Sequence, residues 1–441
     1  MTEALNTEYR IGLSSKLRGC LTIVVMCLAL SACKFTPIVA NEWAGDELPD
    51  LGNTSTVGVE DPYDYINLLR TNAGMIEVTQ NSFLVASAVN HAEYLSLNNG
   101  IIQHEETLGM PGYTGVHAGD RAVSVGYSTY NVGEGIANSR TQTGAMDNLM
   151  SAIYHRFTLF NVTYDEIGIH YVSPQATSLD ILVHNMGNSR VNQVCQTESA
   201  ISSGSYYPDI CSPKFNISAT VVDGAVNEIA QLNPEMIVWP QQNAVDIPPA
   251  FYEETPDPLP NHSVSGNPIS VQFNPAKVQN ASITAFHLYD ESTYSYVLST
   301  HLMDATNDPN GNFSELDFAL FPLERLEWGR RYRVELEYQQ DGVEKSVMWR
   351  FTTRVLDGPV YRLTSKQNDV TISKSGKSFI YFVPKDGTDI MSQFDTAHLS
   401  NIDVTVDYVD YNTLSIDVLG NAGDEITVVL NGSRTINVTL Q

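Results

Sequence analysis

The chain has 441 residues, with 51 acidic and 24 basic side chains and a formal net charge of −27 at pH 7. Such an acidic body would repel nucleic acid and anionic lipid headgroups, so both are excluded as partners of the folded part. The sequence also contains no cluster of basic residues that would form a local exception. A chain of this length is expected to form about two to four domains.

Residues 1–32 have the features of an export signal and are set apart from the fold. Positively charged residues precede an apolar stretch, residues 19–32, which is shorter than the about 20 residues that a membrane-spanning helix needs. The stretch ends in Leu30-Ser31-Ala32-Cys33, which resembles a bacterial lipobox, so Cys33 is the predicted site of lipidation. Lys34 stands where an inner-membrane lipoprotein would carry Asp. We therefore expect an outer-membrane lipoprotein of a Gram-negative bacterium, or a secreted protein if Cys33 is not lipidated.

Only two cysteines follow Cys33, namely Cys195 and Cys211, and an even number is typical of an oxidising compartment. We expect them to form a disulfide, which on a chain-entropy estimate would stabilise the fold by roughly 3 kcal/mol. A zinc site built on this pair is disfavoured, because the segment between the two cysteines contains no histidine.

Helical and strand patterns follow one another over residues 60–190, which are expected to form an α+β domain after a polar tether at residues 33–59. The predicted helices cover about residues 61–74, 82–98 and 145–154, and the predicted strands cover residues 167–172 and 181–185. His91 lies on the apolar face of the second predicted helix. It is therefore expected to be a buried core histidine and not a site residue.

The rest of the chain is predicted to be β structure after residues 191–235, a connector that carries the cysteine pair. From residue 236 onward apolar and polar residues alternate with a period of two, which is typical of half-buried strands. Residues 236–355 resemble the Ig-like β-sandwich modules attached to many exported proteins, and residues 356–441 are expected to form a small all-β domain. Near the end, Asn431-Gly432 between two strand patterns indicates a hairpin with a type I′ turn.

Five short motifs follow one another between residues 66 and 168. They are Ile66–Arg70 with Ala73-Gly74, Ala88–Ala92 with His104, Gly119–Ala122 with Gly126-Tyr127, Gly133–Ala137, and Tyr154–Arg156 with Glu166–Gly168. In this order they resemble the CAP superfamily of cysteine-rich secretory, antigen 5 and pathogenesis-related proteins, in its bacterial form. The resemblance implies an α-β-α sandwich with a large cleft. The expected fold class is therefore a multidomain chain, with this α+β domain followed by all-β modules.

Eukaryotic members of that superfamily place two histidines and two glutamates in the cleft. The resemblance puts His104, Glu134 and His155 at three of these positions. The fourth falls near Ala152, which has no polar group, so at most three site groups are expected. Gly135 stands where the superfamily usually has Asn.

Each of these three residues also has a plain structural explanation. His104 lies in a polar segment, where it would be a solvated loop histidine. Glu134 lies between two glycines and would accept hydrogen bonds from backbone amides. His155 would be a favourable charge at a helix C-terminus. The family resemblance favours the cleft for all three.

Two imidazoles and a carboxylate would hold zinc or another divalent ion loosely, or act as general acid and base without a metal. The segment His104–Leu108 is not a His-Glu-x-x-His zinc-protease motif, and no Gly-x-Ser-x-Gly motif supplies a nucleophile. We therefore expect a cleft that binds a small apolar or metal-bridged ligand, or an extracellular partner, without catalysis. The alternatives are a metal-dependent hydrolase of peptides or esters that uses the same residues, and a structural or adhesive envelope protein.

Overall fold

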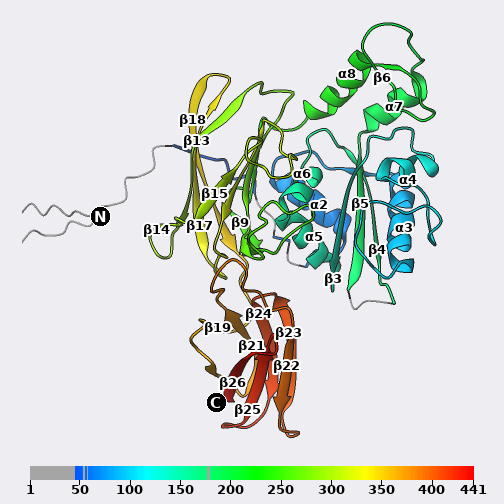
Figure 1. Cartoon of the computed structure of the whole chain (residues 1–441). Helices are drawn as coiled ribbons and strands as arrows, with labels where there is room; N and C mark the ends of the chain where they lie inside the picture. Colours follow the sequence, from blue (N-terminus) through cyan, green and yellow to red (C-terminus); the bar gives the residue numbers. More distant parts are fainter. Residues whose placement is uncertain (1–44, 53–54, 57, 176–178) are drawn as a thin grey trace, which may run out of the picture. The chain divides into compact units, whose positions relative to one another are not determined.

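The computed structural model describes residues 45–52, 55–56, 58–175 and 179–441 (Figure 1). The predicted export signal, Cys33 and the first part of the predicted tether lie outside these residues. Residues 45–441 form one compact unit. Within the described ranges, no helix has the length and apolar character needed to cross a membrane.

A four-stranded sheet with the order β2-β4-β5-β3 forms the centre of the first part of the chain (Figure 1). Its strands are β2 (Thr79–Gln80), β3 (Gly133–Ser139), β4 (Glu166–Val172) and β5 (Asp180–Gly187). Helix α3 (Ser82–Leu97) covers one face, and α2 (Pro62–Asn72) and α5 (Gln142–Ser151) lie on the other. The predicted α-β-α arrangement is confirmed, and β3 is an edge strand of the sheet.

Strand β5 distributes its side chains between the two faces with the expected period of two. Ile181 and Val183 join the hydrophobic cluster that contains the α3 residues. Leu182 and Met186 join the cluster that contains the α2 and α5 residues. His184 lies between Leu182 and Met186 on the same face of β5, so its imidazole is on the side of the sheet that faces α2 and α5.

The predicted helix over residues 145–154 is wrong at its C-terminal end. Helix α5 ends at Ser151, Ala152 leaves the helical conformation with φ −77° and ψ 116°, and α6 (Ile153–Leu159) begins at the next residue. No Gly or Pro marks this break, so sequence periodicity gives no sign of it. As a consequence His155 lies in the first turn of α6 and not at a helix C-terminus.

The predicted disulfide between Cys195 and Cys211 is confirmed. Around it the chain forms more regular structure than a connector, with a small apolar core of its own that includes Val191, Ile217 and Val222. The elements are α7 (Ser189–Thr197), β6 (Tyr206–Tyr207), β7 (Ile217–Ser218) and α8 (Ala219–Ala230). Helices α7 and α8 pack against each other.

Two further sheets follow and share one apolar core. The first has the order β1-β18-β17-β13-β14, with β9 also paired to β18, and the second has the order β15-β16-β12-β8. The strands of the first are β1 (Asp46–Glu47), β9 (Ala244–Ile247), β13 (Ala281–Asp290), β14 (Ser295–Tyr296), β17 (Arg331–Gln340) and β18 (Val343–Thr353). Those of the second are β8 (Met236–Trp239), β12 (Ile269–Phe273), β15 (Thr300–Met303) and β16 (Asp317–Pro322). The short strands β10 (Ala250–Phe251) and β11 (Ser265–Gly266) pair with each other.

Part of the predicted tether is a strand of this sandwich. β1 runs parallel to β18, with Asp46 opposite Val347. The Glu47 carboxylate accepts hydrogen bonds from Arg350 Nη1 at 2.7 Å and from Gln242 Nε2 at 2.8 Å. The chain entering from the N-terminus is therefore fixed to the sandwich before it reaches α2.

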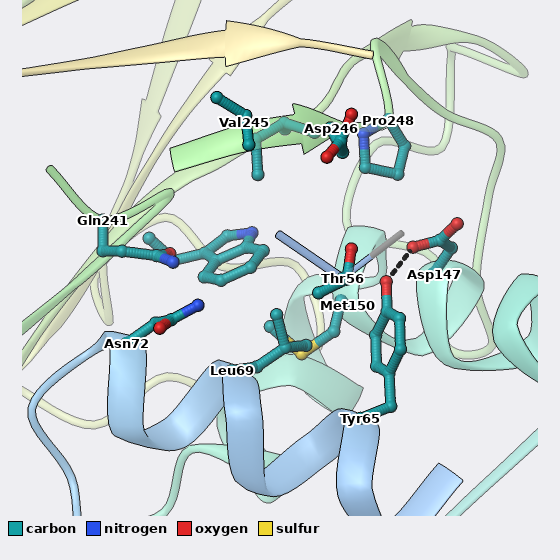
Figure 2. Close-up of a pocket in the computed structure, with 12 residues that line it drawn as sticks. Thr56, Tyr65, Leu69, Asn72, Asp147, Met150, Gln241, Val245, Asp246 and Pro248 are labelled. Carbon is teal, nitrogen blue, oxygen red and sulfur yellow. Dashed lines mark hydrogen bonds between the residues drawn. The ribbon is translucent and has the colours of Figure 1, made fainter. Parts of the chain in front are cut away.

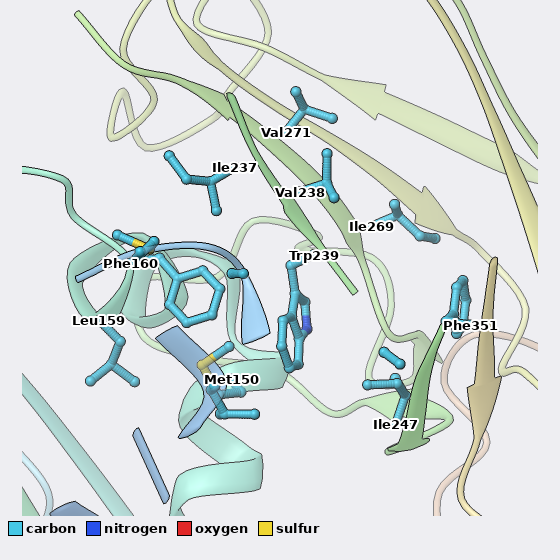
Figure 3. Close-up of a cluster of buried hydrophobic side chains, with 14 of the residues drawn as sticks. Met150, Leu159, Phe160, Ile237, Val238, Trp239, Ile247, Ile269, Val271 and Phe351 are labelled. Atoms are coloured by element: carbon cyan, nitrogen blue, oxygen red, sulfur yellow. The ribbon is translucent and has the colours of Figure 1, made fainter. Parts of the chain in front are cut away.

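The α+β part and the sandwich share a continuous hydrophobic core (Figure 3). Phe160, after α6, packs edge-to-face on Trp239 of β8, with ring centroids 5.5 Å apart. Arg156 of α6 is fully buried and its guanidinium donates to Pro268 O at 2.7 Å and to Asn267 Oδ1 at 2.8 Å. Burial lowers the pKa of Arg156 to about 9. Because a buried polar group must keep its hydrogen bonds, these contacts fix how α6 packs against the sandwich.

The C-terminal part contains two four-stranded sheets around a separate core. One has the order β19-β21-β24-β23 and the other β20-β26-β25-β22. The strands are β19 (Val360–Leu363), β20 (Asp369–Ile372), β21 (Ser375–Phe382), β22 (Phe394–His398), β23 (Asp403–Asp410), β24 (Thr413–Leu419), β25 (Glu425–Leu430) and β26 (Arg434–Leu440). The predicted hairpin at Asn431-Gly432 is confirmed, and both residues have positive φ, although three residues and not two separate the paired ends Leu430 and Arg434.

Candidate functional site

Glu134 is the most strongly held carboxylate in the predicted cleft. It lies on the edge strand β3 with a side chain 4% exposed. Its Oε1 accepts from His104 Nδ1 at 3.0 Å, and its Oε2 accepts from Arg121 Nη2 at 2.6 Å. Burial alone would raise the pKa of Glu134, but the His104 hydrogen bond and the charges of Arg121 and His91 lower it below its ordinary value. Among the described residues, Glu134 accepts from these side chains and not from backbone amides, so its explanation as an acceptor for backbone amides is wrong.

Arg121, in the short helix α4 (Ala118–Ser124), holds both members of this pair. Besides Glu134 it binds the backbone of the His104 segment, since Nη1 donates to His104 O and to Val116 O, each at 3.0 Å. Its side chain is fully buried. Because the planar guanidinium fixes several acceptors at once, Arg121 sets the orientation of His104 relative to Glu134.

His91 is the buried core histidine that the sequence predicted. Its Nδ1 lies 2.9 Å from Glu106 Oε1 and its Nε2 lies 3.0 Å from Gln103 O. Glu106 is also buried and accepts from Thr114 N at 2.6 Å. Both ring nitrogens of His91 are thus used, and the residue supports the loop that carries His104 without offering a free nitrogen to a ligand.

His155 has a carboxylate partner that the sequence analysis did not predict. Its Nδ1 lies 2.8 Å from Glu254 Oε2, and the two side chains are 13% and 2% exposed. Glu254 lies in the loop between β10 and β11, 99 residues further along the chain. The expectation of at most three polar groups, based on Ala152, is therefore wrong, because a second carboxylate arrives from outside the predicted domain.

The two histidines form a matched arrangement. The rings of His104 and His155 are stacked, with centroids 6.2 Å apart and planes 21° from parallel. An ionised carboxylate can only accept a hydrogen bond, so each Nδ1 must donate to its glutamate. The neutral tautomer of each ring then carries its proton on Nδ1 and leaves Nε2 unprotonated. Two oriented imidazoles whose Nε2 atoms carry no proton are suited to bind a cation or to exchange a proton.

A cleft of about 410 Å³ opens beside His104 and Glu134. Its lining mixes polar and apolar groups and comprises His104, His117, Ala118, Gly119, Asp120, Tyr130, Val132 and Glu134. The side chain of His104 is 48% exposed. His104 is therefore partly solvated, as expected for a loop histidine, and also pairs with Glu134 in the cleft. A mixed lining of this kind suits a ligand that carries both polar and apolar groups.

A third histidine, His184, lies directly behind Gly135. It is fully buried, and neither of its ring nitrogens has a hydrogen-bond partner among the described residues. A Cβ on Gly135 would lie 2.1 Å from His184 Nε2, so the imidazole fills the space that a side chain at position 135 would need. Burial, and next the nearby charge of His155, lower the pKa of His184 to about 3. This ring is therefore neutral at ordinary pH.

His104 and His155 could contribute to an open metal site but are too few for a closed one. No group of three or more His, Cys, Asp and Glu side chains within the described ranges is arranged to hold a metal ion. Metal-binding histidines usually donate their second N–H to a carboxylate, as His104 and His155 do here. These two residues could thus supply two ligands, with the other positions left to water or to a bound molecule.

A second, much smaller pocket lies where α2 and α5 meet the strands β8 and β9 (Figure 2). Tyr65 points its hydroxyl at Asp147 there, with 2.5 Å between the oxygens. Asp147 also binds Arg354 Nη2 at 2.7 Å. The volume of about 20 Å³ has room for about one water molecule, so this pocket is part of the packing and not a ligand site.

Sequence reasoning missed Glu254, Arg121, Glu106 and His184 as members or neighbours of the site. Arg121 lies inside one of the family motifs, and His184 is a histidine within an apolar strand, so both had a local signal. Glu254 had none, because nothing in its own segment distinguishes it from its neighbour Glu253.

A family model matches one part of the chain, and some solved structures resemble it. The model of the cysteine-rich secretory protein family, CAP, matches residues 63–186. An outer surface protein from Borrelia burgdorferi is 22% identical, with 28% of this chain and 87% of that protein covered and a TM-score of 0.25. An extracellular protein with an SCP domain from Bacillus anthracis is 18% identical, with 28% of this chain and 38% of that protein covered and a TM-score of 0.24. No curated protein matches the chain. Residues 63–186 are therefore a CAP domain of the cysteine-rich secretory protein family.

Proposed function

We propose that this chain is an exported protein of the bacterial envelope whose CAP cleft binds a ligand through His104 and His155 without converting it. The observation that carries the proposal is the matched pair of His–carboxylate contacts, His104 with Glu134 and His155 with Glu254. Both contacts use Nδ1, so each ring keeps its Nε2 for a ligand.

A divalent cation such as Zn²⁺, carried alone or by a bound molecule, suits these nitrogens. The glutamates would orient the two imidazoles and increase their basicity, as carboxylates do behind metal-binding histidines. Two protein ligands leave open positions that a ligand's own carboxylate or amine could fill. The ionisable side chains of the lining, His104, Asp120 and Glu134 among them, support this metal-bridged ligand over the purely apolar one that the sequence analysis also allowed.

One observation favours the hydrolase alternative, namely that the oriented imidazoles of His104 and His155 could act as general base and acid. The two functions differ in outcome, because a hydrolase would release products from a peptide or ester at a rate that depends on both histidines.

Export is supported by the disulfide Cys195–Cys211, since disulfides persist in oxidising compartments. The signal-like residues 1–32 and the lipobox-like Cys33 support an anchor in the outer membrane. The similar proteins described above, an outer surface protein and an extracellular protein, are in line with a surface location. The β modules would then hold the cleft away from the membrane.

The test is a zinc titration by calorimetry of the chain without residues 1–33, with His104→Ala, His155→Ala and His117→Ala variants. His117 is the matched control, because it also lines the cleft but pairs only loosely with the exposed Glu105, at 3.8 Å. We expect one bound ion, lost in the first two variants and retained in the third. A wild-type chain that binds no zinc, or binding that survives both substitutions, would contradict the proposal. Peptide or ester hydrolysis abolished by His104→Ala would replace it with the hydrolase.

A further inference from the structure

Helix α6 begins without a capping side chain of its own. Its N-cap residue is Ala152, which cannot accept hydrogen bonds from the free amides of the first turn. Glu254 performs that role from a distant part of the chain, since both of its carboxylate oxygens lie 3.3 Å from Tyr154 N. A negative charge at this position is also favourable to the helix dipole.

The same carboxylate fixes the adjacent imidazole. Glu254 Oε2 lies 2.8 Å from His155 Nδ1, and the glutamate side chain is 2% exposed. Few water molecules can compete for a carboxylate that is buried to this extent, so its preference for a donor at Nδ1 dominates the choice of tautomer. Glu254 therefore links the start of α6 to the orientation of the site histidine.

The segment that carries Glu254 is held on both sides. Phe251 before it and Leu259 after it belong to the apolar cluster that contains Ile153 of α6. Asn310, in the loop between β15 and β16, donates to Asp257 O at 2.7 Å and to Tyr154 Oη at 3.0 Å. The position of Glu254 is thus set by the sandwich and the CAP domain together, and not by a free loop.

We propose that Glu254 is the positioning residue of His155, so that the sandwich completes the ligand site of the CAP domain. This inference rests on the proposed function. It assigns to residue 254 the place of the carboxylate that Ala152 lacks, and it makes the ligand site a joint product of two parts of the chain. Without Glu254 the His155 ring loses its fixed tautomer, and its Nε2 is no longer reserved for a ligand.

The experiment uses the chain without residues 1–33 and the variants Glu254→Ala and Glu254→Gln, with Glu253→Gln as the matched control. Glu253 is the exposed neighbour of Glu254. The first readout is the ¹⁵N spectrum of the imidazoles in the metal-free, histidine-labelled protein, with His155 assigned by its own substitution. The second readout is the zinc dissociation constant from calorimetry.

We expect His155 in the wild type and in Glu253→Gln to carry its proton on Nδ1. In Glu254→Ala the signal should shift toward the Nε2–H tautomer, and the dissociation constant should rise about 10–100-fold, as is usual when such an orienting partner is removed. In Glu254→Gln both tautomers become accessible, since an amide can accept from or donate to Nδ1. This variant decides the question if Glu254→Ala does not fold.

An unchanged His155 tautomer together with unchanged zinc affinity in the Glu254 variants would overturn the inference. The two readouts also separate it from the proposed function. A wild-type chain that binds no zinc contradicts the proposed function, whereas the tautomer spectrum of the metal-free protein still decides whether Glu254 positions His155.

Discussion

Replacing His184 with Leu should remove an acid-sensitive element from the CAP domain. The ring is fully buried on the α2 and α5 side of the sheet, and the described residues offer neither nitrogen a hydrogen-bond partner. Leu is of similar size and is apolar like the neighbouring Leu182 and Met186, which belong to the core on that side. Because an unsatisfied buried polar group costs about 1–3 kcal/mol, His184→Leu should match or exceed the wild-type stability at pH 7.5.

The larger effect is on the pH dependence. Burial, and then the charge of His155, lower the pKa of His184 in the fold from 6.5 to about 3, an effect that Glu134 opposes and His104 adds to. As pH falls below about 6.5 the unfolded chain takes up a proton that the folded chain refuses until about pH 3, so stability falls across this window. The loss is about 3 kcal/mol at pH 4.5 and approaches about 5 kcal/mol near pH 3.

Hydrogen–deuterium exchange of the β4 and β5 peptides, corrected for the intrinsic pH dependence of exchange, reports the stability of this domain within the whole chain. Measured at pH 7.5 and 4.5, the wild type should lose about 3 kcal/mol more than His184→Leu, and the difference between the two chains cancels the other titrating groups. Equal losses in both chains would refute the reasoning, because His184 would then be protonated in the fold as readily as in the unfolded state.

Three further predictions concern the stability of the fold. Gly135→Ala should destabilise the CAP domain by about 1–3 kcal/mol in urea unfolding, because the new Cβ would clash with His184 Nε2. Adding His184→Ala to the same chain should recover most of this loss of stability. Equal destabilisation in the single and the double variant would contradict the prediction. Arg156→Met should lower the free energy of unfolding by about 3 kcal/mol in the same assay, since it leaves the buried oxygens of Pro268 and Asn267 without a donor. An unchanged urea midpoint would show that these hydrogen bonds do not stabilise the fold. Replacing Cys195 and Cys211 with Ser should cost roughly 3 kcal/mol and expose the segment between them to limited proteolysis, whereas protease resistance equal to that of the wild type would refute the loop-closure argument.

Local patterns in the sequence predict most of the elements of the CAP domain. The helix α3, the strands β4 and β5 and the burial of His91 follow from periodicity that neighbouring residues set. The break at Ala152 does not, because its conformation depends on a cap that comes from Glu254. Propensity in one window cannot represent a partner about one hundred residues away.

The candidate site shows the same division. His104 and Glu134 are held close together because Arg121 binds the backbone oxygen of the first and the carboxylate of the second, and the family motifs point to both residues. The partner of His155 is set by the packing of the sandwich on α6, which involves Phe251 and Ile153 and has no signature in the sequence. The motifs of the CAP domain therefore predict the site residues within that domain, but not the residue that the sandwich contributes.

The proposed site requires His104 and His155 to bind one ligand together. This can be measured as a double-mutant cycle of zinc affinity with His104→Ala, His155→Ala and the double variant. If both imidazoles hold the same ion, each single substitution should lose nearly as much affinity as the double one. Losses of affinity that simply add, or a double variant that binds zinc as tightly as the wild type, would show that the two histidines do not share a ligand.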